Sequence, residues 1–432
     1  MSAGCLNFQS NERPPDSAGD GTASTHTTRE ADDTATATGR PVAHLTDHGA
    51  AVDGLTDDTE ALRDAIEAAT PNGFLKLPPG EILIGSEQTD AITLEARHRG
   101  LTIRGSGPDR TRLKMAPGHE SVHRGILIAS SVPTDSESIN IEHLTLDGQG
   151  LEQDFNIGTG IVVEPNGGEG RRMVVRNCVI RDWAVNGLSL REPGTRIYGS
   201  SMLLNGRKQE AVTGRDGHGV AAGVGDNPNG ENVIQGCLFR GNTGAGADNA
   251  GGNMTIRDCV ITECGYGVKQ NDTTGTQVIE NTRITDLRTE PGIYNIPPDE
   301  VGGDLVLDTV LMEDLQWAGI DLPARGTLSG DRIVVKRTDL GSHQGAGVLV
   351  RDEGRELDIG EMSVHGTTGG TALRFERSTG SIERLVHGNN DEGLGETSDV
   401  EIGSLESGDA LGISVPTAKQ VGAKAILGPK NG

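Results

Sequence analysis

The chain has few aromatic residues and few lysines, and it lacks a long apolar run. Aromatic side chains make up only 2 % of the 432 residues and hydrophobic ones 34 %, which disfavours a compact globule with a thick core. No apolar stretch reaches the ~18 residues that a membrane-spanning helix needs. Only eight lysines occur and they form no basic stripe, which excludes nucleic acid as the expected partner.

Acidic residues dominate the charge. The chain has 63 Asp and Glu against 38 Lys and Arg, for a formal net charge of -25. Such a surface suits high salt, where the Debye length falls to about 3 Å at 1 M and self-repulsion is screened. We therefore expect a halophilic source; the alternative is an acidic surface that serves solubility.

The N-terminal segment predicts export. Met1-Ser2-Ala3-Gly4-Cys5 places small residues directly before a cysteine, which resembles the end of a lipoprotein signal with Cys5 as the lipidated residue. The charged and apolar regions that precede such a site are not there, so either the start codon is assigned too late or the match is coincidental. Residues 9–40 have almost no large apolar side chains and are predicted to form a disordered tether. We expect an extracellular or cell-surface protein, attached to a membrane only through a lipid anchor at Cys5.

Residues 41–99 are predicted to form an N-terminal cap. Asp57 and Glu60 give a helix-start pattern ahead of an amphipathic stretch, which predicts a helix over residues 58–69. One such helix ahead of many strands suits a plug over the open end of a strand array, which would otherwise expose unpaired strands and core.

Residues 100–375 repeat with a period of roughly 25 residues. This period is too short for a propeller blade, has no helical periodicity and lacks the Leu and Asn framework of leucine-rich repeats. We predict an all-β, right-handed parallel β-helix of roughly 10–12 coils, with residues 376–432 as degenerate last coils and a C-terminal cap. Each period contains a glycine followed by an apolar residue, at Gly160-Ile161, Gly187-Leu188, Gly219-Val220, Gly246-Ala247, Gly267-Val268, Gly292-Ile293, Gly319-Ile320 and Gly347-Val348.

A family resemblance supports the same fold. The segment from Thr46 to Leu62, TDHGAAVDGLTDDTEAL, and the LPPG at residues 77–80 resemble the opening of the pectate-lyase-superfamily β-helix. That superfamily includes rhamnogalacturonase-like, epimerase-like and phage-tailspike proteins, so the resemblance implies extracellular work on a polysaccharide and leaves a trimer open. It does not fix the reaction, because one fold carries lyases, hydrolases, epimerases and binding proteins.

Stacked coils bring residues about 25 apart in sequence to a spacing of ~4.8 Å. If the apolar residue after each glycine points inward, the next residue points outward, which predicts a column of Ser189, Ala221, Asp248, Lys269, Tyr294 and Asp321. The residues before the glycines give a second set: Asn186, His218, Ala245, Tyr266, Pro291 and Ala318. Polar groups cluster in the middle coils of both sets, where an extended polymer can bind.

This cluster fits an enzyme that cleaves a uronic-acid polymer by β-elimination. Such an enzyme removes the proton α to a carboxylate while a positive group neutralises that carboxylate. Lys269 is the candidate base, and His218 and Tyr294 are candidates for proton transfer. Asp248 and Asp272 are candidate Ca²⁺ ligands or ion-pair partners of Lys269. Substrate contacts are expected from Asp216, Tyr266, Asp321 and Asn186.

Other interpretations stay open. Gly217-His218-Gly219, with Asp216 before it, resembles the Gly-His-Gly of polygalacturonase-type hydrolases, but the preceding coil offers no paired aspartates for acid and base. His218 can instead be a turn residue. The protein can also be a non-catalytic glycan-binding or structural surface β-helix, and the polar cluster a solvated face with incidental ion pairs.

Overall fold

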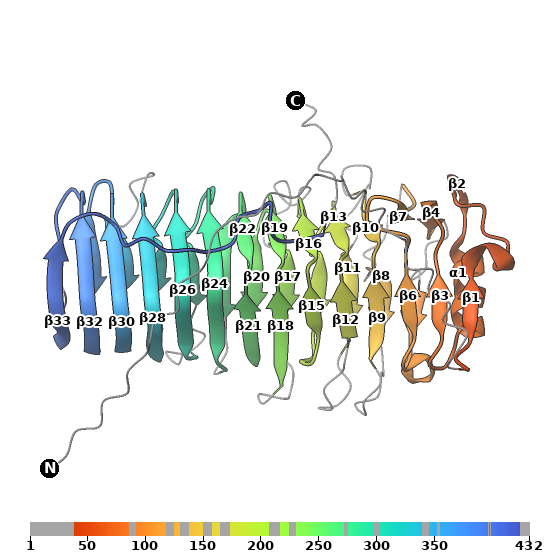
Figure 1. The fold of residues 1–432 in the computed structure, drawn as a ribbon, viewed down its shortest axis with the longest axis horizontal. Coiled ribbons are helices and arrows are strands. Elements are labelled where there is room, and N and C mark those ends of the chain that lie inside the picture. The colour runs from red at the N-terminus through yellow and green to blue at the C-terminus, as the bar shows by residue number, and fades with distance from the viewer. Residues whose placement is uncertain are drawn as a thin grey trace, which may run out of the picture. The chain divides into compact units, whose positions relative to one another are not determined.

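The computed structural model describes residues 39–85, 92–117, 125–129, 138–149, 158–164, 173–206, 217–223, 230–271, 275–296, 303–338, 345–351, 355–395, 397 and 399–423. Residues 40–432 belong to one structural unit. Its strands stack in parallel along one axis and form the predicted parallel β-helix (Figure 1). In the part of the chain that is described, no helix is both long and apolar enough to cross a bilayer. Cys5 and most of the predicted tether lie outside that part.

Sheet B, the smaller sheet, has 11 strands and lies within the predicted range of coils. Its strands pair in the order in which the chain reaches them. They are β5 (Ile92–Leu94), β8 (Gly125–Ala129), β11 (Thr159–Val163), β14 (Leu188–Leu190), β17 (Val220–Ala222), β20 (Ala245–Asn249), β23 (Tyr266–Asn271), β25 (Ile293–Ile296), β27 (Ile320–Leu322), β29 (Ala346–Val350) and β31 (Thr371–Phe375).

Sheet A, the larger sheet, has 22 strands in two columns that meet at a corner. The first column holds β1 (Val42–His44), β3 (Phe74–Lys76), β6 (Thr102–Arg104), β9 (Ile139–Glu142), β12 (Met173–Arg176), β15 (Arg196–Tyr198), β18 (Glu231–Gln235) and β21 (Asn253–Arg257). The second holds β2 (Asp53–Asp57), β4 (Gly80–Ile84), β7 (Thr111–Met115), β10 (Thr145–Asp147), β13 (Val179–Arg181), β16 (Ser201–Leu203), β19 (Leu238–Arg240) and β22 (Val260–Thr262). Both columns continue in the long strands β24 (Gln277–Thr285), β26 (Leu305–Glu313), β28 (Thr327–Lys336), β30 (Glu356–His365), β32 (Thr379–Gly388) and β33 (Asp399–Ser407).

Left-handed residues turn the corner of sheet A. Asn177, Asp258 and Asn281 have φ of 50°, 54° and 41°, and Gly199 and Gly236 have φ of 51° and 64° at the equivalent positions of their coils. Gly, Asn and Asp adopt this conformation at the lowest cost. The corner therefore recurs wherever the sequence supplies one of these residues between two short strands.

The repeated glycines mark close contacts between coils of sheet B. A Cβ on Gly187 would come within 2.6 Å of the carbonyl oxygen of Gly219, and one on Gly267 within 2.2 Å of that of Gly292. Such distances are below van der Waals contact, so only glycine fits. The apolar residues next to these glycines are register partners from coil to coil and are buried, which makes one interior ladder. Burying each of its larger members contributes about 1.5–3 kcal/mol.

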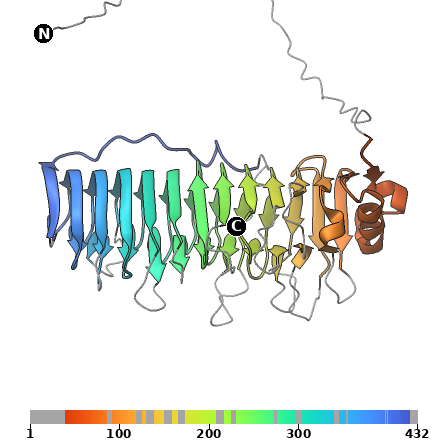
Figure 2. The same ribbon diagram turned by 90° about the horizontal axis from the view of Figure 1, so that it is seen from below.

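The helix lies at the N-terminal end of the stack (Figure 2). Helix α1 (Thr59–Ala68) buries Leu62 and Ile66 in the core, next to the short 3₁₀ helix η2 (Leu45–His48); a second such helix, η3, covers Ala96–His98. Asp58 stands at the N-cap, but its carboxylate accepts hydrogen bonds from the backbone N–H groups of Ala51 and Val52, at 2.7 and 3.1 Å.

Strands of sheet A begin before residue 100, within the segment that was predicted as the N-terminal cap. β1 pairs with β3, and β3 pairs with β6, in continuous parallel register. The segment assigned to a cap therefore already supplies strands to sheet A, which local sequence did not show because its spacing differs from the later period.

The C-terminal segment supplies the predicted last coils and then turns back along the stack. β32 and β33 continue the regular register beyond residue 375, and residues 408–423, here called the strap, run back along the stack (Figures 1 and 2). The N–H of Leu411 donates to Ser363 Oγ at 3.2 Å, and the N–H of Ala423 donates to Ser201 Oγ at 3.0 Å.

The strap covers an apolar column on the outer face of sheet A. This column consists of Leu238, Val260, Leu311, Val334 and Val386, interrupted by Arg283 and Ser363. Its five apolar members point outward and yet are at most 5 % exposed. Val421 and Ala423 pack against Leu238 and Val260. The strap thus removes from water a stripe that the alternation of the strands leaves outside the core.

Candidate functional site

Sheet B brings the predicted site residues into register. Asp248 pairs with Lys269, Lys269 with Tyr294, and Tyr294 with Asp321, each on the adjacent coil. Ser189 and Ala221 precede them in the same register. These six residues are called the polar column below. The structure thus brings together four of the predicted site residues, Asp248, Lys269, Tyr294 and Asp321, as consecutive neighbours.

Burial distinguishes the polar column from an ordinary solvated face. Lys269 is 7 % exposed, Asp248 8 % and Asp321 1 %. Charged side chains are rarely buried to this extent unless they are paired, because desolvation is costly. The interpretation as a solvated face with incidental ion pairs therefore does not describe these residues.

His218 is held by two contacts in which its ring nitrogens take different roles. Its Nδ1 accepts a hydrogen bond from the N–H of Ala245 at 2.9 Å, which places the proton of a neutral ring on Nε2. Nε2 lies 3.2 Å from Asp248 Oδ2, and Asp248 Oδ1 accepts from Asn271 Nδ2 at 2.6 Å. Both nitrogens of His218 are thus engaged within the protein. This geometry favours a role in orienting Asp248, and leaves Lys269 and Tyr294 as the proton-transfer candidates.

An aromatic pair flanks Lys269. The rings of Tyr266 and Tyr294 stack with centroids 5.7 Å apart and planes 20° from parallel. Lys269 Nζ lies 5.2 Å from the centre of the Tyr266 ring, a distance at which the ring attracts a cation. Burial raises the pKa of Tyr294, and the Asp321 carboxylate raises it further, whereas the Arg351 guanidinium opposes them. Tyr294 is therefore held in its protonated form.

Arg351 belongs to the site and was missed from the sequence. Its Nε and Nη2 each lie 3.0 Å from one oxygen of Asp321, in a bidentate ion pair. The alternation of side chains along a strand could have predicted it. Asp321 pairs with Leu349, and Arg351, two residues further on, points to the same side of the sheet. The Arg351 side chain is 30 % exposed, although the Asp321 side chain that it pairs with is buried.

Asn186 forms a hydrogen bond with the backbone of the next coil, near one end of the polar column. Its Oδ1 accepts from the N–H of His218 at 2.9 Å, and its Nδ2 donates to Ser189 Oγ at 3.2 Å. Asn186 thus joins two coils that precede the coil of Asp248 in the chain. Asp216 and Asp272 lie outside the described residues.

Calcium binding stays a prediction, because Asp272, one of its two predicted ligands, lies outside the described residues. No group of three or more Asp, Glu, His or Cys side chains converges among them. Both oxygens of Asp248 are engaged by His218 and Asn271, whereas Ca²⁺ takes six to eight oxygen ligands. We therefore derive no chemical step through calcium.

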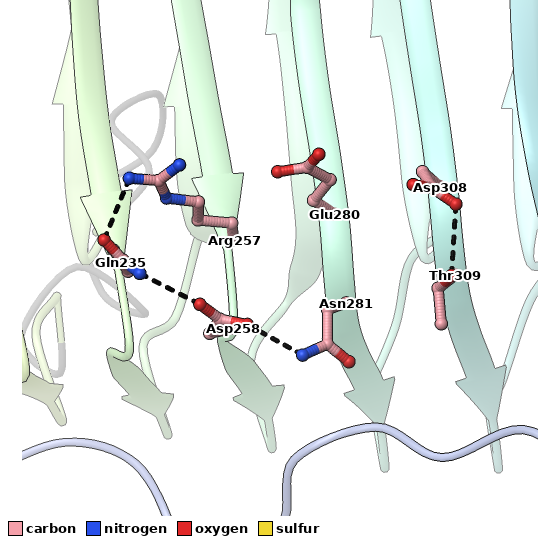
Figure 3. A pocket seen from close by; sticks show the side chains of 7 residues that line it. All are labelled: Gln235, Arg257, Asp258, Glu280, Asn281, Asp308 and Thr309. Atoms are coloured by element: carbon pink, nitrogen blue, oxygen red, sulfur yellow. Dashed lines mark hydrogen bonds between the residues drawn. The ribbon is translucent and has the colours of Figure 1, made fainter.

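A polar hollow lies on sheet A, at the corner between its two strand columns (Figure 3). It has a volume of about 340 Å³. Arg257 donates to Gln235, Gln235 donates to Asp258, and Asn281 donates to Asp258, at 3.0, 3.0 and 2.7 Å. Glu280, Asp308 and Thr309 complete its lining. The described residues that line it include no lysine, histidine or tyrosine, unlike those of the polar column on sheet B.

A part of the chain is similar to enzymes whose names refer to the polysaccharides mannuronan and alginate. The chain is 33 % identical over 110 residues to mannuronan C5-epimerase AlgE5 of Azotobacter vinelandii, which is 24 % of this chain and 11 % of that protein. It is 34 % identical over 109 residues to alginate lyase 7 of the same organism, 24 % of this chain and 12 % of that protein. The matches thus span about a tenth of the length of these relatives.

Solved structures share the fold at low sequence identity. The A-module of mannuronan C-5 epimerase AlgE6 from Azotobacter vinelandii matches with a TM-score of 0.53 and 15 % identity, over 85 % of this chain and 99 % of that one. The catalytic unit of a GH87 α-1,3-glucanase from Streptomyces thermodiastaticus matches with a TM-score of 0.51 and 15 % identity, over 84 % of this chain and 70 % of that one. Both likenesses show the β-helix fold alone.

The family described as "Rhamnogalacturonase A/epimerase, pectate lyase-like" matches residues 43–294. This range is more than half of the 432 residues and includes Lys269 and Tyr294, though it ends before Asp321 and Arg351. The chain therefore belongs to the rhamnogalacturonase A/epimerase, pectate lyase-like family.

Proposed function

We propose that the protein cleaves a uronic-acid polysaccharide by β-elimination at the polar column of sheet B. The observation that carries this proposal is the register pairing of Lys269 with Tyr294, next to the stacked ring of Tyr266. The two groups stand about 4.8 Å apart along the stack, which puts a base and an acid within reach of one sugar residue. Membership of a family with polysaccharide-active relatives supports the substrate class.

The reaction begins at the carbon next to the sugar carboxylate. Lys269 Nζ, in its neutral form, takes the proton from C5, and the electron pair of that C–H bond forms a double bond between C4 and C5. The bond from C4 to the glycosidic oxygen breaks with its electron pair on oxygen. The lysine becomes an ammonium ion beside the negative charge that develops on the carboxylate, and the Tyr266 ring 5.2 Å away stabilises this cation.

Tyr294 supplies the proton that the departing oxygen needs. Its raised pKa keeps the phenol protonated across the neutral and mildly alkaline range, as a general acid requires. The stacking on Tyr266 fixes the plane of the ring. His218 and Asn271 meanwhile hold Asp248 next to the base.

We also propose that this reaction takes place outside the cell and in high salt. The acidic composition, with 63 acidic residues against 38 basic ones, supports the salt adaptation. The polymeric substrate class supports a place outside the cell, because a long polysaccharide does not enter a cell intact.

A second candidate, C5-epimerisation, is favoured by the relatives that carry this name. Elimination and epimerisation of a uronate share the loss of the C5 proton and differ in the next step. In epimerisation a proton returns to C5 from the opposite face, and the glycosidic bond survives.

The products decide between these reactions. Wild-type protein is incubated with polymannuronate, alginate and polygalacturonate in high-salt buffer made with D₂O, and both the absorbance of unsaturated uronides and the deuterium at C5 are followed. Elimination predicts new absorbance together with chain shortening. Deuterium at C5 in chains of unchanged length would establish epimerisation, and new reducing ends without absorbance would establish hydrolysis. Binding without any of these changes would leave a glycan-binding module.

A further inference from the structure

Tyr294 is surrounded by charged and titratable groups from several strands. β23 presents Lys269 and Tyr266 on one side, and β27 presents Asp321 on the other. Arg351 follows β29, and Glu290 precedes β25; both act electrostatically on the phenol. The pKa of Tyr294 therefore depends both on these neighbouring charges and on the burial of the phenol.

Asp321 places a negative charge next to Tyr294, because it is the direct register partner of Tyr294 on the next coil. At 1 % exposure it is almost fully withdrawn from water. A carboxylate in such a place acts strongly on a neighbour, since solvent screens it little. It also needs a counter-charge in order to stay ionised.

Arg351 supplies that counter-charge in a fixed geometry. Its fork meets both oxygens of Asp321 at 3.0 Å. Arginine suits this role because its planar guanidinium matches a carboxylate and stays charged. Lysine cannot reproduce the two parallel hydrogen bonds.

We propose that Asp321 and Arg351 are positioning residues that act through Tyr294: the buried carboxylate keeps the phenol protonated as the proton donor, and the guanidinium keeps the carboxylate ionised and in place. This inference rests on the proposed function for its catalytic meaning, although its electrostatic part is measurable without substrate. Neither residue lies in the family-matched range, which ends at residue 294, so the pair is a feature of this chain beyond the matched segment.

The two members of the pair affect Tyr294 in opposite directions. Asp321→Asn removes a negative charge and leaves Arg351 without it, so the Tyr294 titration moves to lower pH. Arg351→Lys keeps a positive charge but loses the fork, so Asp321 is neutralised less well and the titration moves to higher pH. If the pair had only a structural role, the two substitutions would not shift the Tyr294 titration in opposite directions.

The chain allows a direct measurement, because it has only three tyrosines. Tyrosinate absorbance is titrated in the full chain and in Tyr294→Phe, and the difference gives the titration of Tyr294. For Asp321→Asn we expect a shift to lower pH by about one unit, and the alkaline limb of kcat moves in the same direction. For Arg351→Lys we expect a smaller shift to higher pH. Asp308→Asn, on sheet A, is the matched control and leaves the titration unchanged.

The inference is overturned if Asp321→Asn lowers the melting temperature and kcat but leaves the Tyr294 titration where it was. Should Asp321→Asn fail to fold, Arg351→Lys decides alone, and an unmoved titration in that variant overturns the inference as well. If the variants move the titration but wild-type protein transforms no uronate polymer, the proposed function is wrong while the electrostatic action of the pair on Tyr294 is upheld.

Discussion

Two outward columns of this β-helix contain buried side chains, and different contacts bury them in each column. The apolar column of sheet A is at most 5 % exposed, and the strap lies over it. The polar column of sheet B buries Asp248, Lys269 and Asp321 through contacts with charged and aromatic neighbours. Strand alternation alone would leave both columns in water.

The two columns differ in what covers them. The chain itself already occupies the apolar column. Tyr294 of the polar column and its neighbour Tyr266 are only half-buried, and the nearby Arg351 side chain is 30 % exposed. If the protein acts on an extended polymer, we expect that polymer to bind along sheet B, because a ligand on the apolar column has to displace the strap.

The largest effect is expected at the base. Lys269→Met should lower the rate of polymer cleavage by about 10²–10⁴-fold, because the proton at C5 loses its acceptor. The melting temperature should change little, since the methionine keeps the stem of the side chain on the Tyr266 ring. Initial rates of absorbance increase and a thermal scan measure both.

Lys336→Met is the matched control for this substitution, because Lys336 lies on β28 of sheet A. It should retain the wild-type rate. Equal losses in the two variants would show that activity does not depend on the polar column.

Removal of the strap should lower stability and spare the chemistry. Truncation after Ser407 exposes the apolar column, which we expect to lower the free energy of unfolding by roughly 3 kcal/mol or more. The folded fraction should keep its kcat at temperatures well below the new transition. Truncation after Ala423 serves as the control and should leave the melting temperature unchanged. A strapless chain as stable as the full chain would mean that the strap rests on the face without stabilising it.

Leu238→Ala tests the same contact at one position. Leu238 packs with Val421 and Ala423, so its truncation should lower the free energy of unfolding by about 2 kcal/mol in the full chain. In the strapless chain the same change should have a much smaller effect, because the leucine is already exposed there. A double-mutant cycle by chemical denaturation measures the difference, and strict additivity would contradict the proposed contact.

The smallest effect is expected at the aromatic pair. Tyr266→Phe keeps the ring and should change KM and kcat little, whereas Tyr266→Ala removes the stacking partner of Tyr294 and the face that meets Lys269. We expect the alanine variant to lower kcat/KM by about tenfold, which corresponds to ~1.4 kcal/mol. Steady-state kinetics on a uronate polymer test this. A loss in the phenylalanine variant equal to that in the alanine variant would assign the effect to the hydroxyl instead.

The sequence predicted the fold and the register of the polar column because close packing fixes the glycines. Gly187 and Gly267 have no space for a Cβ, so their positions recur from coil to coil and can be recognised without a structure. From one glycine to the next, strand parity then placed Asp248, Lys269 and Tyr294 as neighbours.

The parts that were missed depend on contacts that local pattern does not encode. The strap binds Ser201 from a position 222 residues later in the chain, and an extended segment without repeats carries no sign of its partner. The pairing of Arg351 with Asp321 was missed although parity places both outward, because the prediction used only the positions next to the glycines. Burial of the column could not be predicted either, since it arises from neighbouring side chains on several coils.

A structure of Lys269→Met with a bound uronate oligosaccharide is the decisive test of the polar column as the active site. We expect the oligosaccharide to lie along sheet B, with one sugar carboxylate beside position 269 and a glycosidic oxygen within hydrogen-bond distance of Tyr294. An oligosaccharide bound instead in the hollow formed by Gln235, Asp258 and Asp308 on sheet A would contradict this assignment.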